Sequence, residues 1–289
     1  MMDKGSHNKN YKDGVFRLLF NEPKAASELY YALTCERCDE KDIELITLGD
    51  VLASPFKNDL AFIVGEKAMI ISEHQSTLNA NMPLRILLYL GRLMENFLSL
   101  KDLKTSLYDA RPLKLPSPQF VVLYNGDAEW HVDNLSLSSL FNSDIEKALG
   151  YIELTVPIIN INKGKSPAIE ARSKILSEYT ALIATVKDFV KQGDIIDNAV
   201  KKAIKWCKGT GILEDFLLRH GGVIVSILSD EFDLEASRKN DREYWMEEGL
   251  KEGQKKEQIN MVRKLKKTVL TLEQIAQISG LSVNDVEKI

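Results

Sequence analysis

The 289-residue chain has few cysteines and no long apolar run. Three cysteines are an odd number for a chain of this length, which argues against a disulfide framework and indicates a reducing compartment. No uninterrupted apolar stretch approaches the roughly 20 residues that a membrane-spanning helix needs. The first ten residues are polar and lack the apolar segment of a secretory signal. We therefore expect a cytoplasmic protein with no membrane partner.

The chain also lacks an excess of positive charge. Its 38 Lys and Arg residues against 42 Asp and Glu residues give a net charge of −4. A nucleic-acid-binding domain usually has a basic surface, so this balance counts against such a partner. It does not exclude one, because carboxylates that hold a cation add negative charge and basic residues can gather on one face.

One stretch combines apolar runs with acids at a particular spacing. Residues 59–64 and 68–75 are rich in Ile, Val, Phe and Met and flank a Gly65-Glu66-Lys67 turn, which predicts a β-hairpin. If the turn is centred on Glu66, Asp59 faces Glu73, and their Cβ atoms are about 4.5–5.5 Å apart. A divalent cation between the two carboxylates would remove their repulsion.

The alternation of side chains along a strand extends this site. Gln75 shares the face of Glu73, whereas His74 points to the other face and is expected to be a core histidine. Asp59, Glu73 and Gln75 together form an oxygen-rich set suited to Mg²⁺ or Mn²⁺. The alternative is a polar edge hairpin whose acids face solvent.

These residues resemble the PD-(D/E)XK nuclease core, in the variant where Gln replaces the usual Lys. Within that superfamily, the residues resemble one branch in particular, the recombination-promoting nuclease (Rpn) or putative transposase family. Its features recur in order along most of the chain, at Asp13-x-x-Phe16, Asn58-Asp59-Leu60, Glu73-His74-Gln75-Ser76, Arg85, Tyr89, Leu123-Tyr124-Asn125-Gly126 and Ile275-Ala276-x-x-Ser279-Gly280-Leu281-Ser282.

The resemblance implies a Mg²⁺-dependent DNA endonuclease that is linked to recombination or mobile elements. Asp59 and Glu73 would bind the metal, and the neutral Gln75 would orient the attacking water or bind phosphate. Asp13 and Glu28 are possible accessory acids, although a helix cap and a solvated helix face explain them as well.

A helix over residues 84–98 would bring basic residues toward the acids. Arg85, Tyr89 and Arg92 fall on one polar face of this helix at i, i+4 and i+7 spacing. They are candidate DNA contacts, because guanidinium groups pair with phosphate oxygens. The alternative is that Arg85 pairs with Glu73.

The order of predicted elements gives the fold class. Strands at residues 43–48, 59–64, 68–75, 119–124 and 151–161, with helices between, predict an α/β core of the PD-(D/E)XK restriction-endonuclease type, a mixed sheet flanked by helices. Pro157 would place the last strand at an edge or a bulge. Helices at 168–191, 195–207 and 213–218, the last ended by Gly221-Gly222, and a long charged helix at 229–267 predict an all-helical C-terminal region.

We accordingly expect a nuclease domain at residues 11–162, a helical region at 163–228, and the long helix with a helix-turn-helix-like module at 229–289. In that module, Thr271 and Gln274 form a capping box, Gly280 ends a helix and Ser282 caps the last one. Asp285 and Glu287 would oppose DNA binding by the last helix, so packing or homo-oligomerisation is the preferred role.

Two rival functions remain at this point. A catalytically inactive nuclease fold could serve as a nucleic-acid-binding or regulatory partner, and RNA could replace DNA as the substrate.

Overall fold

The computed structural model describes residues 14–46, 59–77, 79–129, 132–142, 151–266 and 270–288. At residues 59, 234–249 and 251–256 it describes the backbone alone. The predicted site residue Asp13, the motif residue Asn58 and the end of the first predicted strand lie outside the described residues.

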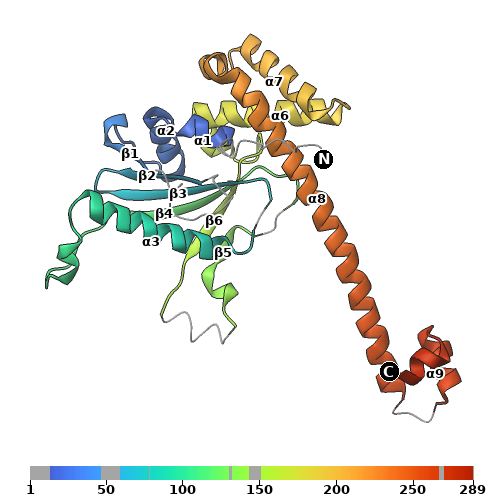
Figure 1. Cartoon of the computed structure of the whole chain (residues 1–289). Coiled ribbons are helices and arrows are strands. Elements are labelled where there is room, and N and C mark those ends of the chain that lie inside the picture. The colour runs from blue at the N-terminus through green and yellow to red at the C-terminus, as the bar shows by residue number, and fades with distance from the viewer. Residues whose placement is uncertain are drawn as a thin grey trace, which may run out of the picture. The chain divides into compact units, whose positions relative to one another are not determined.

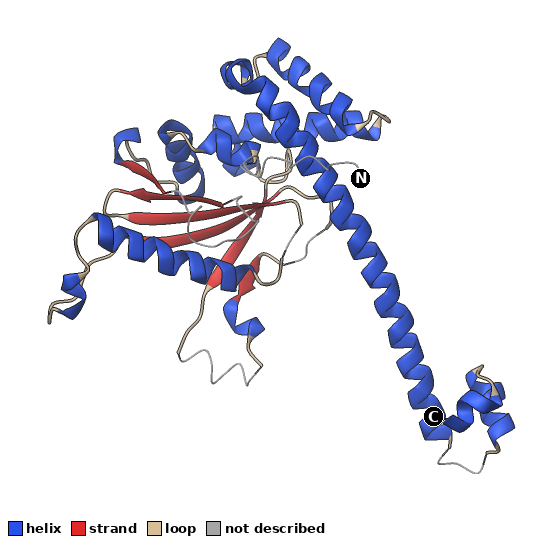
Figure 2. Ribbon diagram, viewed as in Figure 1, coloured by secondary structure: helices blue, strands red, loops and turns tan. Residues whose placement is uncertain are grey.

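The chain is an α/β protein with a mixed sheet and a helical C-terminal region (Figures 1 and 2). Its strands are β1 (Ile43–Ile46), β2 (Asp59–Val64), β3 (Ala68–Gln75), β4 (Ser117–Tyr124), β5 (Asn134–Ser136) and β6 (Thr155–Asn160). Its α-helices are α1 (Val15–Phe20), α2 (Pro23–Thr34), α3 (Met82–Leu100), α5 (Pro167–Glu170), α6 (Lys174–Lys191), α7 (Ile196–Thr210), α8 (Glu214–Leu265), α9 (Leu272–Ser279) and α10 (Val283–Lys288). Short 3-10 helices are η1 (Glu40–Asp42), η3 (Thr105–Tyr108) and η4 (Leu137–Leu140).

The predicted hairpin is confirmed at both strand boundaries and in its register. β2 and β3 pair antiparallel with Asp59 opposite Glu73 and Val64 opposite Ala68. Gly65 has a φ of +52°, which glycine tolerates without the steric cost that other residues would meet. The sheet order is β1-β2-β3-β4-β6-β5.

The two faces of the sheet are covered by different helices. Alternate residues of β2 and β3 contribute to two apolar clusters, as expected for strands buried on both sides. Leu60, Phe62 and Ile70 pack with α1, α2, α6 and α7, and we name this the α6 face (Figure 1). Ala61 and Ile71 pack with α3 on the other face, here the α3 face.

Strand directions gather the ends of several strands at one edge. β3 runs parallel to β4, and β4 runs parallel to β6, so Gln75, Tyr124 and Asn160 end at the same edge. β2 is antiparallel to β3, so its first residue, Asp59, lies at that edge too. α3 follows β3 closely in sequence, which brings the beginning of the helix near these strand ends.

Three predictions about the sheet and helices were wrong. The short strand β5 was not expected, and β6 lies between β4 and β5 rather than at the edge. Pro157 is tolerated because the pairing of β6 with β4 begins only at Ile158.

The predicted helix at 168–191 is two helices, since Ser173 caps α6 by accepting a hydrogen bond from the Leu176 amide.

The third error concerns Gly221-Gly222. The helix that was expected to end there continues as α8, which also includes the long charged stretch. Buried Leu217 and Ile224 flank the two glycines, and their packing outweighs the helix cost of about 1 kcal/mol per glycine.

The chain divides into two compact units, residues 1–233 and 234–289. In the second unit the end of α8 packs with α9 and α10 around buried Val262, Ile275 and Val286. The predicted capping box of Thr271 and Gln274 is confirmed, and so are the other two predicted caps of this segment.

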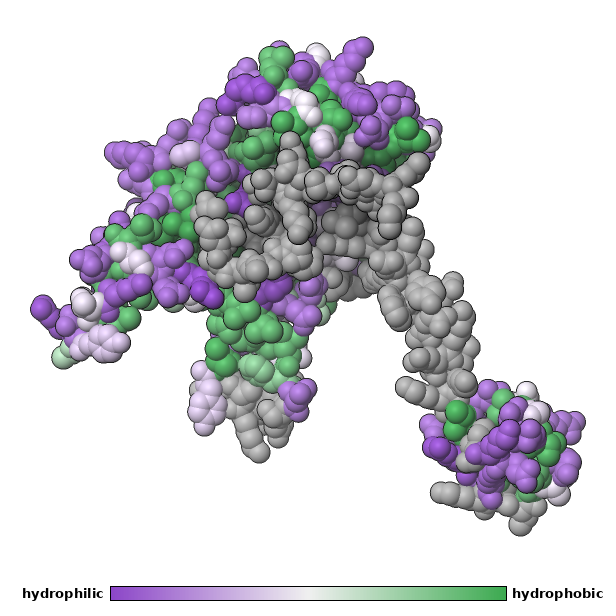
Figure 3. All heavy atoms as spheres, viewed as in Figure 1, coloured by the Kyte–Doolittle hydropathy of each residue, from purple (hydrophilic) through white to green (hydrophobic). Residues whose placement is uncertain are grey.

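The surface view adds one feature of the first unit. Polar residues cover most of the helices, whereas apolar residues gather around β5 and η4 (Figure 3). These residues belong to the cluster on the α3 face, which includes buried Leu137. Among the described residues, we find no helix with the length and apolar character needed to span a bilayer.

Candidate functional site

The candidate site lies where β2 begins and β3 ends. The backbone register places Asp59 and Glu73 directly opposite each other, as the sequence predicted. Glu73 is 1% exposed, which is unusual for a carboxylate because burial removes its hydration. A charge in this position needs compensation by a cation.

Arg85 from the first turn of α3 provides part of that compensation. Its Nη2 lies 3.1 Å from Oε1 and 3.2 Å from Oε2 of Glu73. The same nitrogen donates to the hydroxyl of Tyr89, one helical turn further on, at 3.2 Å. Of the two roles predicted for Arg85, pairing with Glu73 is therefore observed in this structure.

Gln75 lies beside Glu73 on the α3 face, as predicted. Its Nε2 is 3.4 Å from Oε2 of Glu73 and 3.9 Å from the Met82 sulfur. Its Oε1 is buried and has no hydrogen-bond partner among the described residues. An unpaired buried acceptor costs about 1–3 kcal/mol, so this oxygen is suited to a water or ligand that donates a hydrogen bond.

His74 points to the opposite face, and its predicted role as a core histidine agrees with its contacts. Its Nε2 lies 3.0 Å from the hydroxyl of Tyr179, and its ring stacks on Phe16 with centroids 4.7 Å apart. Removal from water and then the charge of Lys187 lower the pKa of His74 to about 3. The imidazole is therefore neutral at physiological pH.

Two other candidates on α3 differ in their surroundings. Tyr89 was predicted on a polar helix face but is 4% exposed, because its ring packs in the apolar cluster on the α3 face. Arg92 is more than half exposed and faces Glu95 across 3.9 Å. A surface pair of this kind contributes little to stability, so Arg92 remains available to an external partner.

The accessory acid Glu28 contacts the start of α6. Its Oε2 accepts hydrogen bonds from the amide of Ile175 at 3.2 Å and from the hydroxyl of Ser173 at 3.4 Å. These contacts satisfy donors that a helix leaves unpaired at its first turn. This geometry gives Glu28 a structural role in the fold.

The donor set available to a cation is small. Among the described side chains, no group of three or more His, Cys, Asp or Glu residues is arranged to hold a metal ion. The set consists of Glu73, the amide oxygen of Gln75, and Asp59, whose backbone alone is described. Oxygen donors of this kind suit Mg²⁺, which keeps several waters and takes few protein ligands.

Sequence reasoning did not identify Lys187 as a contact of the segment that follows β4. This lysine of α6 binds the loop after β4, where its Nζ donates to the carbonyl of Asn125 and, at 2.8 Å, to Oδ1 of Asp127. No local signal identifies it, because one lysine in an amphipathic helix usually faces solvent. Asn125 was noted in the sequence as part of residues 123–126, but its contact with α6 was not predicted.

Comparisons of the chain with protein-family models, with curated proteins and with solved structures return no match.

Proposed function

We propose that this chain is a Mg²⁺-dependent endonuclease of the PD-(D/E)XK type, similar to the Rpn family, that hydrolyses phosphodiester bonds in DNA. Mn²⁺ is the alternative ion, and recombination or mobile elements are the proposed context. The observation that carries the proposal is the buried Glu73, which lies in register with Asp59 and beside the unpaired oxygen of Gln75.

The topology supports the same proposal. A β2–β3 hairpin with a helix after it and a parallel β4 beside β3 is the arrangement that the resemblance implies. The first residue of β2 and the last residues of β3 meet at one edge, which gathers the proposed catalytic residues at the ends of their strands.

The side chains have distinct roles in this proposal. Asp59 and Glu73 would hold the ion, which supplies positive charge to the scissile phosphate and lowers the pKa of a bound water. Gln75 cannot act as a general acid or base, so it orients the attacking water through its amide. Arg85 balances the charge of Glu73 when no metal is bound, and in this proposal its guanidinium would pair with a phosphate oxygen once the ion replaces it at Glu73.

The second candidate function is an inactive nuclease fold that acts as a nucleic-acid-binding or regulatory partner. The Glu73–Arg85 ion pair favours it, because an arginine can replace the metal as the permanent counter-charge. Homo-oligomerisation through the C-terminal helices also stays a prediction.

Supercoiled plasmid cleavage separates these functions. We expect nicking by the wild-type chain in Mg²⁺ and none in EDTA. Glu73→Gln and Asp59→Asn should each lower the rate by about 10³-fold, because several kcal/mol of charge stabilisation is removed.

Glu95→Gln is the matched control, since this exposed glutamate of α3 pairs only loosely with Arg92. It should cleave like wild type. Cleavage that survives in both site variants would refute the assignment, and DNA binding without any metal-dependent cleavage would favour the inactive fold. A labelled RNA of the same sequence tests the alternative substrate.

A further inference from the structure

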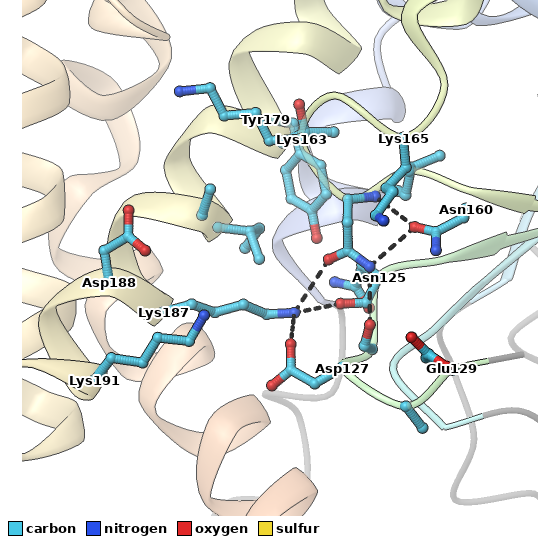
Figure 4. A pocket seen from close by; sticks show the side chains of 17 residues that line it. Asn125, Asp127, Glu129, Asn160, Lys163, Lys165, Tyr179, Lys187, Asp188 and Lys191 are labelled. Atoms are coloured by element: carbon cyan, nitrogen blue, oxygen red, sulfur yellow. Dashed lines mark hydrogen bonds and ion pairs between the residues drawn. The ribbon is translucent and has the colours of Figure 1, made fainter.

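A second polar site lies at the same edge of the sheet but on the α6 face. It is a pocket of about 350 Å³ between the segment after β4, the segment after β6, and α6 (Figure 4). We name it the lysine pocket for the four lysines that line it, Lys163, Lys165, Lys187 and Lys191. The proposed catalytic residues do not line it.

A close backbone approach connects the pocket to the candidate site. Gly126 lines the pocket, and a Cβ atom at this position would collide with the carbonyl oxygen of Ser76. Only glycine therefore permits this approach. The backbone amide of Asn125 also donates a hydrogen bond to the backbone carbonyl of Gln75 at 3.0 Å. One wall of the pocket therefore lies directly beside Ser76, the residue that follows β3.

Lys187 forms hydrogen bonds with both segments that line the pocket. Besides its bonds to Asn125 and Asp127, its Nζ donates to Oδ1 of Asn162 at 3.2 Å (Figure 4). The amide nitrogen of Asn162 in turn donates to the carbonyl of Gly126 at 2.8 Å. Lys187 therefore fixes the two loops to α6, and the charge of Asp127 offsets its own.

Three lysines and one side-chain amide of the pocket are not used in this way. No described residue forms an ion pair with Lys163, Lys165 or Lys191. Asn125 is only 9% exposed, and its Oδ1 has no hydrogen-bond partner among the described residues. Because oxygen and nitrogen of an amide are interchangeable by rotation, this group can donate to an anion as well as accept.

Acidic residues reduce the positive charge of the pocket. Glu129 and Asp188 also line it, so three uncommitted lysines face two carboxylates. The pocket is therefore weakly positive, which suits one phosphate group better than a long stretch of polyanion.

We propose that the lysine pocket binds a backbone phosphate of the same nucleic acid that is cleaved at the candidate site. This inference rests on the proposed function and assigns that site an additional substrate contact. Lys163, Lys165 and Lys191 provide the positive charge, and the side-chain amide of Asn125 provides a hydrogen bond from the pocket wall. Contacts of this type position a nucleic acid without reading its sequence.

The test is DNA binding measured by fluorescence anisotropy in EDTA, where hydrolysis does not occur. The triple variant Lys163→Gln/Lys165→Gln/Lys191→Gln should bind a labelled duplex more weakly than wild type. The slope of log affinity against log salt should fall by about one for each phosphate that the variant no longer binds. Asn125→Asp, which adds negative charge at constant shape, should weaken binding in the same direction.

The matched control is Lys101→Gln/Lys104→Gln/Lys114→Gln. These three lysines are exposed and lie between α3 and β4, toward the opposite edge of the sheet from the pocket. The control variant should keep the affinity and the slope of wild type.

Three results would overturn the inference. The first is an equal decrease in affinity in the pocket and control variants, the second is no decrease in either, and the third is wild-type protein that does not bind DNA. The melting temperature measured with and without inorganic phosphate provides a further test. If phosphate raises the melting temperature of wild type alone while DNA affinity is the same in both proteins, the pocket holds free phosphate instead. Pocket-dependent binding with no cleavage in Mg²⁺ would refute the nuclease and leave the pocket assignment intact.

Discussion

Neighbouring residues at the end of β3 have opposite surroundings. On the α6 face, His74 is neutral, stacked on Phe16 and hydrogen-bonded to Tyr179. On the α3 face, Glu73 is buried with its charge, and Gln75 has an oxygen without a partner among the described residues. His74 has a paired ring nitrogen, whereas Glu73 and Gln75 keep a buried charge and an unpaired acceptor.

The difference separates structural from functional polar residues. A buried polar group that contributes only to folding is usually paired, because an unpaired one costs free energy. Gln75 tolerates such a cost beside the buried Glu73, which is typical of a site that binds something.

The largest effect on stability is expected from Arg85→Ala. The change leaves the buried Glu73 without its guanidinium partner, which should lower the free energy of unfolding by about 3–5 kcal/mol. Mg²⁺ or Mn²⁺ should recover part of this decrease, because a bound cation stabilises the folded state. Urea unfolding with and without metal measures both effects.

Arg92→Ala is the control for this measurement, since its pairing with Glu95 is exposed. It should change stability by no more than about 0.5 kcal/mol. A loss of stability in Arg85→Ala that metal does not reduce would indicate that the pair is only structural.

A smaller effect, on the cleavage rate, is expected from Gln75→Leu. Leucine is close to glutamine in size but has no amide. Cleavage should fall by about 10–100-fold, as for a residue that orients other groups at a metal site. Stability should stay the same or rise slightly, because the unpaired buried oxygen is removed. If urea unfolding shows a stability loss in parallel with activity, Gln75 belongs to the fold and not to the site.

At neutral pH the smallest effect on stability concerns His74, because its contribution changes only on acidification. Its pKa is about 3 in the folded protein and near 6.5 in the unfolded chain, so between these values the unfolded chain binds more protons. Stability should therefore fall as pH falls through this range, by up to about 1.4 kcal/mol per pH unit. Above pH 7 the effect should vanish.

His74→Gln keeps a hydrogen-bonding partner for Tyr179 and should show a flatter dependence of unfolding free energy on pH. His220→Gln, a change on α8, is the control and should retain the wild-type slope. An unchanged slope in His74→Gln would contradict the assignment of a neutral core histidine.

Much of the core of the fold could be predicted from local pattern. The boundaries and register of the β2–β3 hairpin followed from the Gly65 turn and from strand-like runs on both sides of it. The short β5 has only three residues and no apolar run, so periodicity could not reveal it. The break between α5 and α6 had a signal in Ser173, a preferred capping residue that good helix formers on both sides obscured.

The site was predictable to the extent that it depends on one hairpin. The positions of Asp59 and Glu73 followed from register, and the pairing of Glu73 with Arg85 was one of two stated alternatives. The burial of Tyr89 was missed because helical spacing groups it with Arg85 without showing what covers it. Lys187 reaches Asn125 across 62 positions of sequence, which no local pattern reports.

The central claim is that Glu73 helps to hold a divalent cation, and calorimetric titration with Mn²⁺ tests it most directly. The wild-type chain should bind Mn²⁺ in a saturable manner, and Glu73→Gln should bind it at least tenfold more weakly, within the range of about 10–100-fold for groups that support a metal site. Equal binding by both proteins, or no binding by wild type, would contradict the account.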